Sequence, residues 1–466
     1  MSGRDDAGAQ RRARRSAVRL QAIAAARFVR ARWGDRIGGP AGLERRRRRG
    51  LERLLRERMP RAAHYGGGLE RLEDAPVVDK ATVLADFSGF NVFGIALETA
   101  LAEARAAEES RDFRGELPGG VTVGLSSGTS GRPGVFLVDP AERIRWAGTV
   151  LGRLLDRRSV VQLVQPWRPP LRIAFALRAN SNLYESVASR RLSFAFIDLV
   201  APFDRIRRAA AAARPDVLVA PSSVLVELAR AQRRGELDVA PRLVVAVAEV
   251  LDELDAELVG TTWGVRPRRV YQATEGLLAL DCEHGRLHLN EQSVVVEAEW
   301  IDAPDPDAAG RRFVPIVTDF DRSTQLIVRY RLDDVLRMPA GDERCPCGNP
   351  ARVIEAVEGR ADEVIEAHGG DGRIVRVLPD IVRRTLTMAQ AGEWGIRWSP
   401  GALEVGLDPL DAESERAVRG ALAELFETVD AELPALRFVP LPSRSPGAKN
   451  VRITCAAVNE ETADAG

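Results

Sequence analysis

Apolar runs alternate with amphipathic stretches through the middle of the chain, and this alternation predicts an α/β domain. Two stretches with helical periodicity, 203–214 and 224–234, lie between runs rich in valine, leucine and isoleucine. A strand, a helix and a second strand in succession predict parallel pairing, because parallel strands need a crossover connection. The apolar runs are expected to form a largely parallel sheet, and they cover residues 159–167, 171–178, 192–199, 217–223 and 242–250.

The later part of the chain changes character. β-like runs dominate at 313–320, 325–332 and 351–365. Shorter runs then predict a small α+β unit, with strands at 395–400, 403–407, 436–441 and 451–458 and helices at 378–388 and 413–429. The predicted organisation is a basic helical arm over 1–75, a large layered α/β domain over 76–358 and a smaller, mobile α+β lid domain over 359–466.

Length and composition indicate a soluble protein of more than one domain. Of the 466 residues, 45% are hydrophobic and 29% are charged, which is typical of globular proteins. No apolar run approaches the roughly twenty residues that span a bilayer, and the N-terminus lacks the apolar core of a signal peptide. Four cysteines are too few for a disulfide framework. These features predict a cytoplasmic protein without a membrane partner.

Charge is unevenly distributed although the formal net charge is zero. Residues 1–60 contain 18 arginines and 6 acidic residues, and they include the helical runs 17–33 and 51–59. Such a segment could bind nucleic acid or an anionic membrane surface. The periodicity favours a simpler interpretation, in which arginine fills the solvated faces of helices. We therefore expect no nucleic-acid partner.

Residues 124–134, with the sequence GLSSGTSGRPG, lie between two apolar stretches. Glycines allow the backbone to approach a polyanion, and the hydroxyl groups donate hydrogen bonds to its oxygens. The segment matches neither GxxxxGK[ST] nor GxGxxG, and a solvated hairpin turn is the alternative. It predicts a phosphate-binding loop formed by Ser126, Ser127, Gly128, Thr129, Ser130 and Gly131.

Lysine is nearly absent from this arginine-rich chain. Lys80 and Lys449 are the two lysines among 67 basic residues. An ammonium group is a compact charge that can follow a reacting phosphate, whereas a guanidinium group is a rigid fork. Lys449, close to the C-terminus, is therefore a candidate catalytic residue. Lys80 precedes a helical run and is equally well explained by local pairing.

Three cysteines and a histidine form a candidate metal site. Cys345 and Cys347 occupy a tight Cys-Pro-Cys-Gly turn, and a hairpin after Cys282 could bring His288 opposite it. Three thiolates and one imidazole suit a closed tetrahedral site for structural Zn²⁺. His284 competes with His288 as the fourth ligand, and reduced core cysteines are the alternative. The remaining cysteine, Cys455, is expected to be buried in a strand.

Five motifs occur in a fixed order between residues 76 and 455. They are the Ser/Gly-rich loop, Ala248-Glu249, the segment Tyr271 to Gly276, the segment Tyr330 to Asp334, and Gly359-Arg360-Ala361-Asp362. With this order, the sequence resembles the adenylate-forming acyl-CoA and aryl-CoA ligases, and its loop is most similar to the branch of phenylacetate-CoA ligase and coenzyme-F synthetase. Two positions depart from the family pattern, because Arg132 replaces a loop lysine and Lys449 follows Gly-Ala.

The resemblance implies how these motifs would bind MgATP. Ala248 and Glu249 would line the adenine pocket, and the ring of Tyr271 would stack on adenine. Thr274 would bond the α-phosphate, and Glu275 would help to hold Mg²⁺. The large domain would therefore carry the nucleotide.

The resemblance also implies roles for the ribose contacts and the mobile parts. Asp334 would accept hydrogen bonds from both ribose hydroxyls, which its two carboxylate oxygens can do. Arg360 would lie near the ribose, and Asp362 would be the hinge of the lid domain. Lys449 would be the catalytic lysine.

The activity implied by the resemblance is a ligase reaction. A small carboxylic acid would attack the α-phosphate of ATP, giving acyl-AMP and pyrophosphate, and coenzyme A would be the acceptor of the acyl group. Transfer of AMP to a deazaflavin cofactor, as in coenzyme-F synthetases, is an alternative. A nucleotide-binding protein without catalysis is another.

Overall fold

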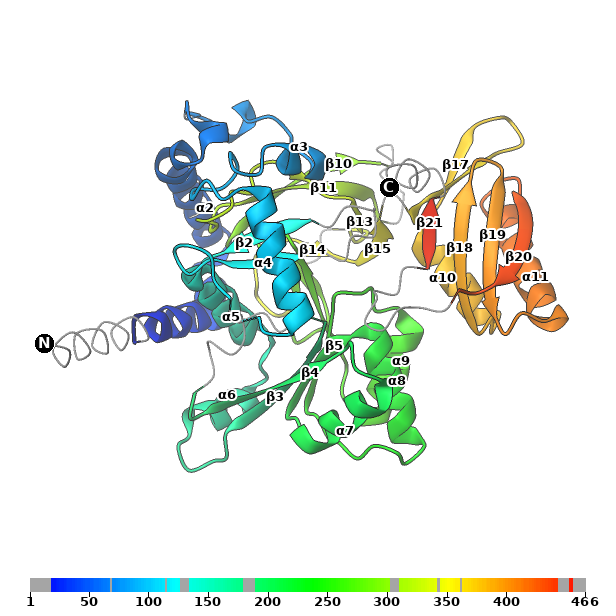
Figure 1. Ribbon diagram of the computed structural model, residues 1–466, viewed down its shortest axis with the longest axis horizontal. Coiled ribbons are helices and arrows are strands. Elements are labelled where there is room, and N and C mark those ends of the chain that lie inside the picture. The colour runs from blue at the N-terminus through cyan, green and yellow to red at the C-terminus, as the bar shows by residue number, and fades with distance from the viewer. Residues whose placement is uncertain are drawn as a thin grey trace, which may run out of the picture.

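The computed structural model contains a large body and a C-terminal unit that lies to one side of it (Figure 1). The structure describes residues 18–67, 69–113, 115–125, 134–178, 189–301, 310–341, 344–360, 363–442 and 452–455. None of the helices in these ranges combines the length and the hydrophobicity that a bilayer-spanning segment requires.

An eight-stranded sheet is the centre of the large body, in the order β14-β9-β8-β7-β6-β5-β3-β4. The five strands from β4 to β7 pair in parallel, as the alternating pattern predicts, and the others pair antiparallel. The strands are β3 (Leu171–Leu177), β4 (Leu192–Asp198), β5 (Val217–Pro221), β6 (Leu243–Val247), β7 (Arg268–Ala273), β8 (Gly276–Asp281), β9 (Leu287–Leu289) and β14 (Val353–Ile354).

Helices cover both faces of the parallel strands, which explains why the central strands β5 and β6 are apolar throughout. On β5, Leu218 and Ala220 belong to the core beneath α7 (Phe203–Ala213), α8 (Ser222–Arg233) and α9 (Glu253–Trp263). Val217 and Val219 point to the opposite face and pack with residues of α5 (Pro140–Leu154) and α6 (Arg157–Val164).

The expected strand at 159–167 is wrong, because residues 159–164 belong to helix α6 and residues 165–167 follow its C-terminal end. Asp156 caps that helix by accepting a 2.8 Å hydrogen bond from the backbone N–H of Ser159. Val160 and Leu163 lie on one side of the helix and pack against the sheet. The run of apolar residues was therefore one face of a short helix rather than a strand.

A second sheet is antiparallel and lies beside the first. Its order is β10-β11-β13-β15, and β12 pairs with β11. The expected strand over 325–332 is largely wrong, because residues 324–326 hydrogen-bond instead to Phe90 and Val92. The strands are β10 (Val294–Trp300), β11 (Arg312–Asp319), β12 (Tyr330–Arg331), β13 (Asp334–Arg337) and β15 (Ala356–Arg360).

A two-stranded hairpin, β1 (Thr122–Leu125) and β2 (Val135–Val138), completes the large body together with N-terminal helices. Arginines of this basic region pair with the body, since Arg27 lies 2.6 Å from Asp321 and Arg36 lies 3.1 Å from Glu283. The helical segments are residues 18–29, η1 (Arg30–Gly34), α2 (Asp35–Arg53), η2 (Leu54–Arg58), η3 (Met59–Arg61), η4 (Ala63–Tyr65), η5 (Leu72–Asp74), α3 (Lys80–Ala85) and α4 (Leu97–Ser110).

The C-terminal unit has an apolar core of its own, in which Trp394 and Phe426 are fully buried. Its four-stranded sheet has the order β20-β19-β18-β21. The predicted domain boundary at residue 359 stays a prediction. The elements are β16 (Ile365–His368), β17 (Ile374–Val377), α10 (Pro379–Met388), β18 (Glu393–Ser399), β19 (Ala402–Asp408), α11 (Ala412–Thr428), β20 (Ala435–Pro440) and β21 (Ile453–Cys455).

Candidate active site

A cleft of about 2290 Å³ is lined by both the large body and the C-terminal unit. Ligands of doubly wound sheets bind outside the carboxyl ends of the parallel strands, and Leu177, Pro221 and Val247 at the ends of β3, β5 and β6 line this cleft. Arg383 and Arg452 line it from the C-terminal unit. The cleft is therefore the candidate active site.

Tyr271 and Asp334 meet at one wall of the cleft. The Tyr271 hydroxyl donates a 2.5 Å hydrogen bond to a carboxylate oxygen of Asp334, which lies 63 residues further along the chain. Burial and the negative charge of Asp334 raise the pKa of Tyr271 well above its ordinary value of 10. The hydroxyl therefore keeps its proton at neutral pH and fixes the orientation of the carboxylate.

Thr274 and Glu275 form the turn between β7 and β8, because Ala273 pairs with Gly276 across it. Both side chains line the cleft. Burial raises the pKa of Glu275, while hydrogen bonds with Thr274 and Tyr330 oppose that shift. The carboxylate of Glu275 is therefore a poorly solvated group for which a cation in the cleft would be a favourable partner.

Asp319 lies next to this turn and was missed by sequence reasoning. A Cβ atom at Gly276 would lie 3.1 Å from an Asp319 carboxylate oxygen, so glycine allows the turn to approach it closely. Asp319 is 1% exposed, and burial raises its pKa to about 7. The signal in the sequence was an acid at the end of an otherwise apolar strand.

Arg360 enters the cleft from β15, where its backbone pairs with that of Asp334. Its guanidinium donates a 3.0 Å hydrogen bond to the carboxylate of Asp333. The preceding Gly359 has a φ of +134°, and a Cβ atom there would lie 2.5 Å from Cγ of Pro379. Only glycine can therefore bring β15 this close to α10 of the C-terminal unit.

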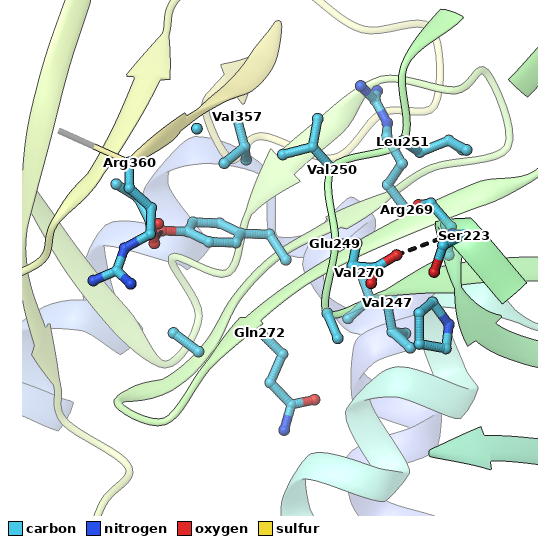
Figure 2. A pocket seen from close by; sticks show the side chains of 18 of the residues that line it. Ser223, Val247, Glu249, Val250, Leu251, Arg269, Val270, Gln272, Val357 and Arg360 are labelled. Carbon is cyan, nitrogen blue, oxygen red and sulfur yellow. Dashed lines mark hydrogen bonds between the residues drawn. The ribbon is translucent and has the colours of Figure 1, made fainter. Parts of the chain in front are cut away.

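Ala248 and Glu249 follow β6 and line the cleft, and Glu249 lies on the opposite side of the pocket from Arg360 (Figure 2). Ala248 has a φ of +64°, and the Glu249 N–H donates a 2.8 Å hydrogen bond to the carbonyl of Val247 across it. This tight turn is strained for a non-glycine residue. It directs the Glu249 carboxylate to the first turn of α8, where it accepts a 2.9 Å hydrogen bond from the Ser223 N–H.

Several predicted residues lie outside the described part of the chain. These are the loop residues Ser126 to Gly131, the hinge residue Asp362 and Lys449. Leu125, the last residue of β1, and Gly134, which directly precedes β2, line the cleft. Lys80 also lines the cleft, at the first position of α3.

Cys282, His288, Cys345 and Cys347 are buried together, and their ligand atoms all lie within 4.8 Å of one another. The Sγ atoms of Cys282 and Cys345 are 3.6 Å apart, and Sγ of Cys347 lies 3.4 Å from Nε2 of His288. Tetrahedral Zn²⁺ with ordinary bond lengths would give edges of about 3.8 Å and 3.6 Å for these pairs. The dimensions of the cluster fit zinc.

The surroundings of the cluster also fit a metal site. Nδ1 of His288 lies 2.9 Å from the carbonyl oxygen of Ala351, an arrangement that leaves Nε2 facing the three sulfur atoms. The backbone N–H of Asn349 donates to Sγ of Cys347. Of the two histidines left open by the sequence, His288 is the one in the cluster.

Comparison with known proteins gives a match in structure. No protein-family model matches the sequence, and no curated protein matches it. The fold is similar to that of 2-hydroxyisobutyryl-CoA ligase in the postadenylation state in complex with R3-HIB-AMP, with a TM-score of 0.58 and 16% identity over 90% of each chain. The same ligase with 2-HIB-AMP gives a TM-score of 0.55 and 15% identity over 96% of this chain and 90% of that chain.

The chain has the fold of an acyl-CoA ligase. This result confirms the predicted α/β fold class and the resemblance in fold to adenylate-forming enzymes. The branch with phenylacetate-CoA ligase and coenzyme-F synthetase stays a prediction. Four of the predicted site residues line one cleft, as the order of the motifs predicts: Tyr271, Glu275, Asp334 and Arg360. Their individual roles stay predictions.

Proposed function

We propose that this protein is an ATP-dependent ligase that activates a carboxylic acid as acyl-AMP, releases pyrophosphate and transfers the acyl group to coenzyme A. One observation carries the proposal. Tyr271, Glu275 and Asp334 meet in one cleft of a chain with the fold of a CoA ligase that was solved with acyl adenylates. Its substrates would be small molecules, and a cytoplasmic location remains our expectation.

The adenosine part of ATP is proposed to bind at the wall formed by Tyr271 and Asp334. The ring of Tyr271 offers a flat apolar surface for adenine, and Ala248 and Glu249 also line the cleft. The Tyr271 hydroxyl already orients the Asp334 carboxylate. That carboxylate is therefore preorganised to accept hydrogen bonds from the ribose, with Arg360 nearby.

The phosphates are proposed to lie between the turn at Thr274 and the loop of Ser126 to Gly131. Glu275 would hold Mg²⁺, which supplies positive charge to the phosphates when bound. The raised pKa of Glu275 supports this role, because a buried carboxylate gains from a cation. Thr274 would donate its hydroxyl proton to an oxygen of the α-phosphate.

The proposed reaction has two steps. A carboxylate oxygen of the acid attacks the α-phosphorus and forms a new oxygen–phosphorus bond. The bond between the α-phosphorus and the oxygen bridging to the β-phosphate breaks, and pyrophosphate leaves with its electron pair. Lys449 would stabilise the negative charge that develops between the carboxylate and the α-phosphate. The thiolate of coenzyme A then attacks the acyl carbonyl, and AMP leaves.

Alternation between the two steps is proposed to depend on the lid domain, residues 359–466. Rotation about Asp362 would withdraw Lys449 and admit coenzyme A. Gly359 supports a junction here, because its positive φ lets the chain pass close to Pro379 of the C-terminal unit.

The cluster of Cys282, His288, Cys345 and Cys347 is proposed to hold one structural Zn²⁺. All four positions are protein ligands, which leaves no coordination site for a substrate. None of the four side chains is among the described residues that line the cleft. The metal would therefore stabilise the large body and take no part in the chemistry.

A pyrophosphate exchange assay tests the proposal. The purified full chain is incubated with MgATP, labelled pyrophosphate and each member of a panel of carboxylic acids, and label in ATP is measured with and without acid. We expect acid-dependent exchange with at least one acid, followed by thioester formation when coenzyme A is added. ATP binding without exchange would indicate a non-catalytic protein, and transfer of AMP to a deazaflavin without acid would indicate an adenylyltransferase.

A further inference from the structure

The hairpin β1–β2 reaches the cleft, and its outer edge is closed by a side chain instead of a third strand. The side-chain carbonyl of Gln325 accepts a 3.0 Å hydrogen bond from the backbone N–H of Leu137. The side-chain N–H of the same residue donates a 3.4 Å hydrogen bond to the carbonyl of Val135. An amide has one acceptor and one donor side, so it substitutes for the peptide group of a neighbouring strand.

Gln325 projects from a backbone that is itself fixed. It is 2% exposed, and its backbone forms an antiparallel bridge with Asn91. On either side, the Leu326 N–H donates to the carbonyl of Phe90 and the Val92 N–H donates to the carbonyl of Thr324, both at 2.9 Å. The side-chain amide therefore holds β2 at a defined position relative to the large body.

The position of Gln325 in the chain connects two parts of the proposed ATP site. Val135, which accepts its hydrogen bond, is the first residue of β2 after the predicted phosphate loop. In the other direction, β12 begins at Tyr330 and β13 begins at Asp334. The side chain of Gln325 thus links the start of β2 to the chain segment that carries Tyr330, which hydrogen-bonds Glu275, and Asp334, the proposed ribose carboxylate.

The other strand of the hairpin is held separately. Arg143 of α5 donates hydrogen bonds to the hydroxyl of Thr122 on β1 and, at 3.1 Å, to the carboxylate of Glu116. Thr122 is the first residue of β1 and pairs with Val138, at the end of the hairpin away from the loop. Gln325 is therefore the nearer of these two contacts to the loop.

We propose that Gln325 is a positioning residue that holds β2, whose residues Phe136 and Val138 line the cleft, at a fixed position relative to the adenosine wall. This inference rests on the proposed function. Loss of the amide would leave two buried backbone groups of β2 without partners and would allow the hairpin to shift. The shift would weaken the phosphate contacts, whereas adenosine, which would contact only the wall at Tyr271 and Asp334, would bind as before.

Isothermal titration with MgATP and with adenosine tests the inference. Gln325→Leu removes both hydrogen bonds at similar volume, and Gln325→Glu keeps the acceptor but loses the donor. We expect the leucine variant to bind MgATP at least about tenfold more weakly and adenosine within about twofold of the unchanged protein. The glutamate variant should lie between, and hydrogen exchange at the Leu137 amide should accelerate in the leucine variant.

Gln162→Leu is the matched control. Gln162 is another buried amide that contacts backbone carbonyls, those of Pro169 and Pro170, and it is not among the described residues lining the cleft. The Gln162→Leu variant should be less stable, but the ratio of its affinities for MgATP and adenosine should be that of the wild-type protein. Equal loss of MgATP and adenosine binding in Gln325→Leu, or unchanged MgATP binding, would overturn the inference. Failure of the unchanged protein to bind MgATP would instead contradict the proposed function itself.

Discussion

The two ends of strand β8 carry polar clusters of opposite character. At its start, the turn of Thr274 and Glu275 lines an open cleft. At its other end, roughly 17 Å along the strand, Cys282 belongs to a group of four buried side chains whose ligand atoms face one another. The first cluster leaves space for a ligand beside a poorly solvated carboxylate, whereas the second is complete.

This difference separates chemistry from stability within one sheet. Catalytic metal and ligand sites keep an open position, and structural sites are closed by protein atoms. Substitutions at the open end are expected to change rates and leave thermal stability nearly unchanged. Substitutions at the closed end are expected to do the reverse. The following experiments test that separation, in order of their effect on pyrophosphate exchange.

Lys449→Ala is expected to have the largest effect. Exchange should fall by about 10³-fold, because the ammonium would act on charge that develops only in the transition state. Binding of MgATP, measured by titration calorimetry, should change little. Lys449→Arg should not restore the rate, since a rigid guanidinium differs from a compact ammonium. If the alanine variant exchanged pyrophosphate at nearly the rate of the wild-type protein, Lys449 would have no catalytic role.

Glu275→Gln should lower the maximal rate of exchange by about 10²-fold, because the neutral amide loses its attraction for Mg²⁺. The melting temperature should stay within a few degrees, since the side chain faces the cleft. Glu299→Gln, an exposed carboxylate paired with Arg331, is the control and should keep the full rate. A large decrease in the melting temperature of Glu275→Gln would mean that Glu275 stabilises the fold.

Asp334→Ala should raise KM for ATP by about tenfold and change kcat less, because ribose contacts act similarly in the ground state and the transition state. A comparison with 2′-deoxyATP sharpens the test. The unchanged protein should prefer ATP, and the variant should use both nucleotides equally well. A preference for ATP that survives the substitution would show that another group binds the ribose 2′-hydroxyl.

The pH dependence of kcat/KM should report the state of Glu275. Its pKa is raised by burial, so the carboxyl group becomes protonated at a higher pH than the ordinary value of 4.5. Activity should therefore decline as pH falls through that raised pKa, with a midpoint above 4.5. The residual activity of Glu275→Gln should lack this acid limb. If activity declined at low pH in the same way in the wild-type protein and in Glu275→Gln, a group other than Glu275 would be responsible for the decline.

Cys347→Ser should have the smallest effect on exchange at 25 °C and the largest on stability. Metal analysis is expected to give about one Zn²⁺ per unchanged chain and little in the variant, with a melting temperature lower by roughly 10 °C. Cys455→Ser is the matched control, because Cys455 lies in β21, outside the cluster. The absence of zinc from protein purified without chelators would rule the site out.

Sequence patterns predicted the parallel strands well, because their apolar runs are buried on both faces of the sheet. The same patterns failed at 159–167 and 325–332. In the first case Asp156 caps a helix, and in the second, pairing is limited to an isolated bridge between Gln325 and Asn91 and to the short strand β12. Both outcomes depend on partners that an apolar pattern does not contain.

The candidate site was predictable as a set of motifs but not as a geometry. Motif order alone grouped Tyr271, Glu275, Asp334 and Arg360, and all four line the cleft. The bond from Tyr271 to Asp334 and the approach of Asp319 to Gly276 arise from the packing of two sheets. Such long-range contacts leave little local signal, which explains why sequence patterns did not single out Asp319 or Gln325.

The Glu249 carboxylate at the first turn of α8 has an electrical consequence for the cleft. The amino end of a helix carries about half a positive charge and commonly attracts phosphate groups. In this protein the Ser223 N–H at that end already donates to Glu249 at 2.9 Å. An incoming anion would have to compete with a carboxylate of the same chain, so we expect the phosphates of a nucleotide bound at the proposed site to point away from α8.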